Sequence, residues 1–205
     1  MYNAPIGLAA KPVITDDMSV RGQGLHEGID IGSPLPDNPD IYAIAQGKIV
    51  HAGVLWDFGN AVVLQHAVDY SLYAHLNSIA VGVGGAIAEG AKIGVMGETG
   101  KAYGRHLHIE LFIPPGATWE SAYANGDRWK CRKNPILEIA ALGDSIPYRD
   151  GGRGTALEQK QRAFTHWVKS IATLERLAPQ DVLDVLRENK LVDPKWSLPA
   201  DPPSA

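Results

Sequence analysis

The chain is poor in cysteine and carries no large excess of charge of either sign. Its 205 residues contain one cysteine, Cys131, which excludes an intrachain disulfide. Lys and Arg number 19 against 23 Asp and Glu, for a formal net charge of -4, so the electrostatics favour no nucleic-acid partner. The short basic cluster formed by Arg128, Lys130, Arg132 and Lys133 is typical of a solvated loop.

Long apolar runs are also missing. No stretch is apolar over the length that a membrane-spanning helix needs. Residues Met1 to Pro12 lack the basic start and apolar block of a secretory signal. We therefore expect a soluble chain with no membrane partner, one that does not export itself by the usual route. An internal repeat is not found either.

Glycine, in contrast, is abundant and punctuates short runs of β-forming residues. The chain has 22 glycines, most of them between about Val13 and Leu142, where they separate apolar segments of strand length. This pattern predicts a mainly β domain built on an antiparallel sheet, from about residue 15 to residue 143, after an N-terminal arm of residues 1–14. The expected strands are 41–44, 48–51, 61–66, 71–75, 92–96 and 106–113.

The hydrophobic period changes towards the C-terminus. Apolar residues from Thr155 to Leu177 recur at helical spacing, and Pro179 can open a second helix that ends near Asn189. We predict a small helical hairpin over residues 155–192, joined to the β domain by a glycine-rich linker, residues 144–154. Residues 193–205, which hold four prolines, are predicted to form an extended or disordered tail.

Histidines and a carboxylate form a candidate metal site. His106 and His108 are two apart in a strand-like run and therefore project onto one face. His26 and Asp30 are four apart, which suits a shared face in a helix or a strand, but the surrounding glycines oppose a helix. His26, Asp30 and one of the His106/His108 pair can supply the three ligands of an open zinc site, with the other histidine and His75 to spare.

A helical metalloprotease signature is the alternative for the first of these segments. His26-Glu27-x-x-Asp30 superficially resembles the HExxH pattern with its last histidine replaced. We reject this interpretation because a strand would place Glu27 on the opposite, wetter face. His51 and His166 are interpreted as structural histidines, and His66 as either a structural histidine or one that supports a metal ligand through a hydrogen bond.

In the order of these motifs the sequence resembles the lysostaphin/LytM-type zinc endopeptidases, which cut the peptide part of bacterial peptidoglycan. The resemblance runs from about Gly24 to Leu142, and its anchors are residues 26–31, 45–50, 59–60, 73–76, 94–100 and 104–110. It implies an antiparallel β peptidase domain that binds one Zn²⁺ per chain. It implies that His26, Asp30 and His108 are the zinc ligands and that His75 and His106 are the catalytic pair.

Two insertions depart from the family pattern. Residues 32–40 form a longer, more proline-rich connection than the usual tight turn, and this could reshape one wall of the groove. The loop from Pro114 to Arg132 is also long, and its aromatic residues Trp119, Tyr123 and Trp129 are interpreted as cover for the sheet.

Two functions follow as alternatives. The first is an active endopeptidase on peptidoglycan stem or cross-bridge peptides, and the second is a non-catalytic peptidoglycan-binding or structural virion module with the same fold. Because no signal peptide is found, we expect a bacteriophage protein, either virion-associated or released from the cytoplasm at lysis to act on the cell wall. The C-terminal helices are expected to dock on the domain itself or on phage tail proteins. The sequence does not decide between a glycine bridge and a D-Ala to diaminoacyl bond as the substrate.

Overall fold

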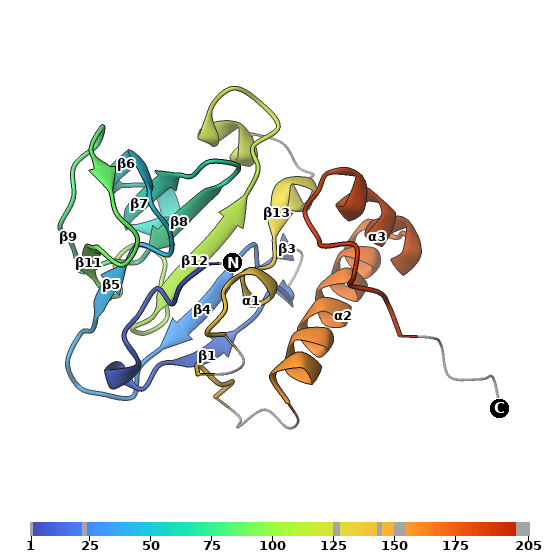
Figure 1. Cartoon of the computed structure of the whole chain (residues 1–205), viewed down its shortest axis with the longest axis horizontal. Helices are drawn as coiled ribbons and strands as arrows, with labels where there is room; N and C mark the ends of the chain where they lie inside the picture. Colours follow the sequence, from blue (N-terminus) through green and yellow to red (C-terminus); the bar gives the residue numbers. More distant parts are fainter. Residues whose placement is uncertain (1, 22–23, 125–127, 143–144, 150–154, 200–205) are drawn as a thin grey trace.

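The computed structural model describes residues 2–21, 24–124, 128–142, 145–149 and 155–199, and its main feature is an eight-stranded sheet (Figure 1). The strands follow the spatial order β1 (Val13–Asp16), β4 (Ile29–Gly32), β12 (Leu107–Phe112), β8 (Tyr70–Ala74), β7 (Asn60–Gln65), β6 (Gly47–Val54) and β10 (Ala86–Ile87), and β13 (Arg132–Lys133) pairs with β12. Every pairing in this sheet is antiparallel. The predicted fold class, a mainly β antiparallel domain with a helical appendage, is confirmed.

Two smaller sheets accompany the main one. One consists of β5 (Asp40–Tyr42), β11 (Lys92–Val95) and β9 (Ser78–Ile79), and the other is the pair β2 (Val20–Arg21) and β3 (Gly24–Leu25). All six strands expected from the sequence are present, as β5, β6, β7, β8, β11 and β12, with ends that differ by a few residues at most.

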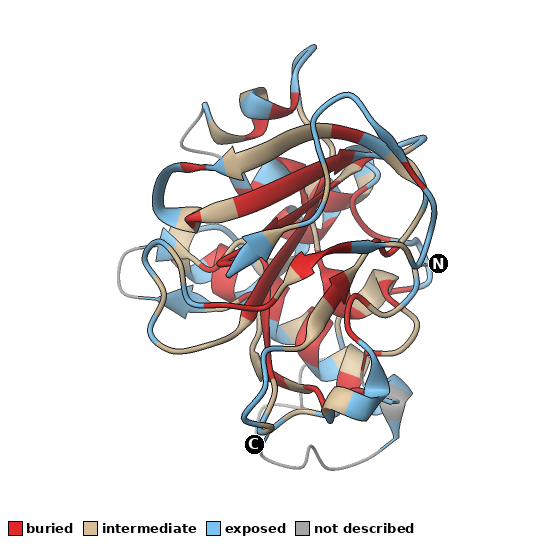
Figure 2. Ribbon diagram, turned by 90° about the vertical axis from the view of Figure 1, so that its left-hand side faces the viewer, coloured by how far each residue is buried: buried red, intermediate tan, exposed pale blue. Residues whose placement is uncertain are grey.

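The main sheet is covered on both faces. Along β7, Val62 and Leu64 belong to one core cluster, whereas Ala61 and Val63 belong to another. This alternation follows from the two-residue period of a strand. All six residues of β12 are buried, and they include the polar side chains of His108 and Glu110. Figure 2 shows the buried residues concentrated through the centre of the molecule.

Three α-helices lie on one side of this sheet. The side chain of Asn134 caps the short α1 (Pro135–Glu138) by accepting the Ile136 N–H. A capping box between Thr155 and Glu158 opens α2 (Ala156–Glu175), and a proline opens α3 (Pro179–Glu188). Both helices of the predicted hairpin are therefore present. No described helix combines the length and apolar character needed to cross a bilayer.

The helical hairpin packs against the β domain. Helix α2 lies beside β2, β3 and α1 (Figure 1). Phe164, Trp167 and Ile171 are fully buried, and they share one core cluster with Ile14 and Met18 of the N-terminal part. Of the two docking sites expected for these helices, the structure shows the one on the chain's own domain.

The segments at the ends of the predicted domain also join this core. Ile6 is buried in the arm, and β1 begins at Val13. Within the predicted linker, Ile146 is buried and Tyr148 pairs with Ile14, while residues 144 and 150–154 lie outside the described part of the chain. Trp196 of the predicted tail packs on Phe164 with ring centroids 5.7 Å apart, and residues 200–205 are not described.

Candidate metal centre and groove

His26 and Asp30 belong to extended chain and not to a helix. His26 directly follows β3, and Asp30 lies inside β4. The rejection of a helical HExxH motif is therefore confirmed. The expectation that Glu27 lies on the more exposed face is wrong. The Glu27 side chain is largely buried, and its Oε2 lies 2.5 Å from Nη2 of the fully buried Arg132.

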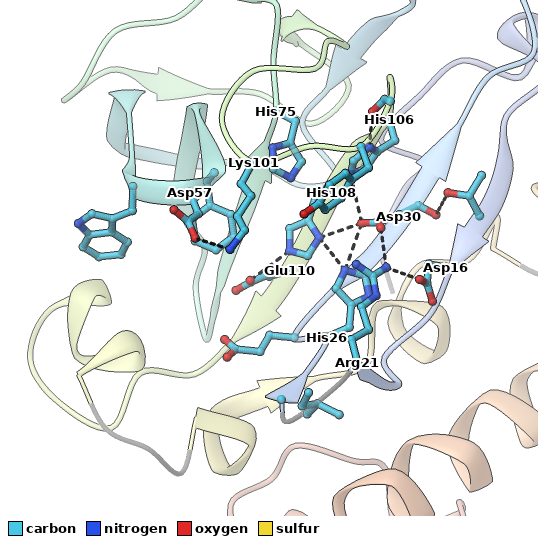
Figure 3. A pocket seen from close by; sticks show the side chains of 18 of the residues that line it. Asp16, Arg21, His26, Asp30, Asp57, His75, Lys101, His106, His108 and Glu110 are labelled. Atoms are coloured by element: carbon cyan, nitrogen blue, oxygen red, sulfur yellow. Dashed lines mark hydrogen bonds and ion pairs between the residues drawn. The ribbon is translucent and has the colours of Figure 1, made fainter. Parts of the chain in front are cut away.

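Strand register brings His108 to Asp30. In the antiparallel pair β4–β12, His108 stands directly opposite Asp30. The Nδ1 atom of His108 lies 2.9 Å from Asp30 Oδ1 and 3.0 Å from His26 Nε2. His26 Nε2 lies 3.2 Å from the same Asp30 oxygen. These three buried side chains thus direct one potential ligand atom each to a common point (Figure 3).

The outer nitrogens of His26 and His108, the two candidate ligand histidines, have acceptors of their own. His26 Nδ1 donates to the backbone carbonyl of Asp17 at 2.7 Å, and His108 Nε2 donates to Glu110 Oε1 at 3.2 Å. Burial lowers the pKa of His108, but its hydrogen bonds to Asp30 and Glu110 raise this pKa to about 9, so the metal-free ring carries a proton on each nitrogen. A metal ion would displace the inner proton, and the outer acceptor would then hold the one N–H that a neutral imidazole keeps. Burial alone would raise the pKa of Asp30, but the hydrogen bonds to His108 and His26 hold this pKa well below its usual value.

His75 and His106 form a second histidine pair beside this cluster. Their ring centroids are 4.8 Å apart, and His75 lies 5.9 Å from the ring of His108. Neither lies in a strand: His75 follows β8 in the left-handed region, at φ 60°, and His106 precedes β12. The structure thus brings together all five residues expected at the site (Figure 3).

The two rings are anchored in the same way. His75 Nδ1 donates to the carbonyl of Thr99 at 2.9 Å, and His106 Nδ1 donates to the carbonyl of Gly104 at 2.8 Å. Burial lowers the pKa of His75 to about 4, so its ring is neutral near pH 7. With Nδ1 as the donor, each neutral ring keeps an Nε2 lone pair that can accept a proton.

Arg21 is a site residue that the sequence did not reveal. Its Nη2 lies 2.8 Å from Asp30 Oδ2, and the same guanidinium pairs with Asp16. Asp30 therefore offers one oxygen to the histidines and the other to an arginine from β2. Nothing in the local sequence marks this contact, because it depends on how the β2–β3 pair folds over β4.

A groove of about 1170 Å³ passes over these residues. Its wall carries aromatic side chains and both signs of charge; beyond the histidines, the lining includes Trp56, Phe58, Tyr103, Tyr123, Asp57, Lys101, Arg105, Arg128 and Arg149. The inserted segment 32–40 is tied to this wall, because Arg105 donates to the carbonyl of Pro36 and to Asn38 Oδ1. An open groove with these charges can accept an extended polar chain.

The basic cluster at residues 128–133 is not a solvated loop, so that interpretation is wrong for two of its members. Arg132 is completely buried, and Lys133 bridges Asp69 and Glu138 at 3.0 and 3.1 Å. The aromatic residues of the preceding loop do cover the sheet: Trp119 and Trp129 are buried. Tyr123 has a further contact, since its hydroxyl donates to Glu110.

Comparison with known proteins agrees with this geometry. Residues 24–130, more than half of the chain, match peptidase family M23. The DD-carboxypeptidase/endopeptidase Mpg of Neisseria meningitidis is 39% identical over 112 residues, and the murein hydrolase activator NlpD of Salmonella dublin is 37% identical over 113. These matches cover 54% and 53% of this chain but only 24% and 29% of the two relatives.

A solved structure shows the same fold. The antimicrobial peptidase lysostaphin from Staphylococcus simulans superposes with a TM-score of 0.54 at 22% identity, over 70% of this chain and 53% of lysostaphin. This identity is low enough that the likeness concerns the fold alone.

Proposed function

Because this chain belongs to peptidase family M23, we propose that it is a zinc endopeptidase that hydrolyses peptide bonds in bacterial peptidoglycan. The observation that carries the proposal is the convergence of His26 Nε2, Asp30 Oδ1 and His108 Nδ1 beside a second histidine pair. A hydrolytic zinc site needs this combination of three protein ligands and proton-transferring groups.

The three donors fit zinc by their chemistry. Two imidazoles and one carboxylate are ligands that zinc prefers, and three of them leave a position open for water or substrate. Both imidazoles donate their outer N–H to oxygen acceptors, the arrangement expected around a metal-bound histidine. The low pKa of Asp30 keeps its ligand oxygen negative at neutral pH.

The catalytic chemistry divides between the metal and the spare histidines. A zinc ion held there supplies Lewis-acid polarisation of the scissile carbonyl and a water of lowered pKa. One of His75 and His106 accepts the proton of the attacking water at Nε2 and delivers it to the leaving amine. The other, protonated at Nε2, donates a hydrogen bond to the oxyanion of the tetrahedral intermediate. The carbonyls of Thr99 and Gly104 accept Nδ1–H from the two rings, so the base keeps its Nε2 lone pair, whereas the oxyanion donor would have to be the doubly protonated imidazolium.

A non-catalytic binding or activating module is the second candidate. Its support is the similarity to NlpD, which is named as a hydrolase activator. All five metal and catalytic positions are filled in this chain, and this favours the enzyme. Three points stay predictions. They are an origin in a phage virion or a lysis system, binding to phage tail proteins, and action on the cell wall after release.

Release of soluble fragments from dye-labelled peptidoglycan tests the proposal. We expect the zinc-loaded protein to release dye and both His75→Ala and His106→Ala to release none while they keep one zinc per chain. A zinc-loaded wild type that binds the labelled wall but releases no more dye than His75→Ala would favour the binding module instead.

A further inference from the structure

Glu110 is a buried carboxylate beside the metal centre. It lies two residues after His108 on β12, on the same face, and it is 1% exposed. Its Oε1 accepts the His108 Nε2 hydrogen bond at 3.2 Å. Its Oε2 accepts the hydroxyl of Tyr123 at 2.7 Å and lies 3.3 Å from Arg132 Nε. One oxygen of this carboxylate therefore binds His108 of the metal centre, and the other faces Tyr123 and Arg132.

Arg132 lies against the second oxygen of this carboxylate in the interior. Its side chain is completely buried between Glu110 and Glu27. Its guanidinium carbon lies 4.6 Å from the ring centroid of Tyr123 and 5.1 Å from that of Phe112. With Tyr123 and Arg132 both placed against Oε2, Oε1 is left to accept the His108 N–H.

The two ligand histidines differ in what fixes them. His26 donates to the backbone carbonyl of Asp17, so a substitution of the Asp17 side chain would leave this acceptor in place. His108 depends on a side chain, because its outer acceptor is Glu110. A proton on Nε2 of His108 leaves the Nδ1 lone pair directed at Asp30 and His26, whereas a proton on Nδ1 would block that ligand position.

We propose that Glu110 is a positioning residue of the metal centre, which holds the proton of His108 on Nε2 and fixes the plane of the ring, and that Tyr123 and Arg132 hold Glu110 in turn. This inference rests on the zinc site of the proposed function. It gives the long loop before β13 a role in metal binding, since this loop carries Tyr123 and leads directly into Arg132.

Glu110→Gln tests the proposal because the shape stays and the acceptors change. An amide cannot serve both sides: with its oxygen towards His108, its NH₂ meets the donors of Tyr123 and Arg132. Reversed, the NH₂ faces His108 Nε2 and favours the tautomer that cannot bind metal. Loss of an outer-shell partner of this kind weakens metal binding by about 10–100-fold. We expect that loss in zinc affinity, measured by competition with a chromogenic chelator on the full chain, and a changed visible spectrum with Co²⁺.

Glu27→Gln is the matched control. It also removes a largely buried carboxylate from Arg132, but the two oxygens of Glu27 pair with Arg128 and Arg132, not with His108, in the described part of the chain. We expect it to lower the Tm of the metal-free protein and to leave the zinc affinity and the Co²⁺ spectrum of the wild type unchanged. Tyr123→Phe keeps every charge and loses only the hydroxyl that holds Oε2, so it should weaken zinc binding less than Glu110→Gln; it decides the question if Glu110→Gln does not fold.

Each result has a clear meaning. Equal zinc affinities of the wild type and a folded Glu110→Gln, or equal losses in Glu110→Gln and Glu27→Gln, would overturn the positioning role. If Glu110→Gln does not fold, a wild-type zinc affinity in Tyr123→Phe would do the same. A wild type that binds no zinc would instead remove the metal site of the proposed function, so the two failures can be told apart.

Discussion

Replacing Trp167 by alanine is expected to destabilise the whole protein and not only the helix that carries it. Trp167 is fully buried in α2 and shares a core cluster with Ile14 and Met18. If this cluster is one cooperative core, the β domain and the helical hairpin unfold together.

The size of the effect follows from two opposing contributions. Burial of a tryptophan removes about 150–250 Å² from water, which at about 25 cal/mol per Å² stabilises the fold by about 4–6 kcal/mol. The Nε1–H of Trp167 is buried and has no hydrogen-bond partner among the described residues, and such a donor costs about 1–3 kcal/mol. Trp167→Ala removes both, so the net loss lies between about 1 and 5 kcal/mol, and we expect about 3 kcal/mol. For a chain of this size that loss lowers Tm by roughly 5–15 °C.

Differential scanning calorimetry of the full chain measures this effect. Trp167→Phe should lose less than about 1.5 kcal/mol, because it fills most of the space and removes the unpaired donor. Leu157→Ala is the surface control on the same helix: its side chain is 69% exposed, so its effect should stay within about 0.5 kcal/mol. Two separate transitions in Trp167→Ala, with the larger one at the wild-type temperature, would refute the single core.

Three further predictions concern the site and its supports. His108→Ala should lose zinc affinity, whereas His106→Ala should keep zinc and lose hydrolysis. Metal analysis of both variants, together with the dye-release assay, checks this prediction. An equal loss of zinc in the two variants would contradict it. Gly59→Ala should lower Tm by several degrees, because φ at this position is +64° and an added methyl would lie 2.4 Å from the Thr99 carbonyl carbon. The Thr99 carbonyl oxygen anchors His75, so the same variant should change kcat more than KM. Burial lowers the pKa of Lys133, but its two carboxylate partners raise it above the usual value. The stability that this ion pair confers is therefore present below pH about 10.4 and lost as the pH rises through the folded-state pKa. Lys133→Met should show a smaller alkaline fall in Tm than the wild type, and an identical pH profile would contradict the assignment.

The strands and helices were largely predictable because their signals are local. Short runs of β-forming residues located β7 and β8 to within a residue, and apolar residues at helical spacing from about Thr155 located the start of α2. Local patterns also indicated that His26 and Asp30 lie in extended chain. The grouping of the five site residues came from the resemblance, and the register of β4 against β12 supplies its physical reason.

The buried polar contacts were not predictable in the same way. Glu27 and Arg132 are 105 residues apart, and each is of a residue type that lies mostly at the surface. Their burial depends on how the long loop folds back over β12. The same holds for Arg21, whose contact with Asp30 is a consequence of the β2–β3 pair.

The account's central claim is zinc-dependent cleavage of peptidoglycan peptides, and mass spectrometry of the products from a defined cross-linked muropeptide tests it most directly. The account predicts that the zinc-loaded protein cleaves the cross-linked muropeptide into fragments whose combined mass exceeds that of the muropeptide by one water for each bond cut. A chelator should stop this cleavage, and added zinc should restore it. An intact muropeptide after incubation with protein that holds one zinc per chain, or cleavage that continues after the metal is removed, would contradict it.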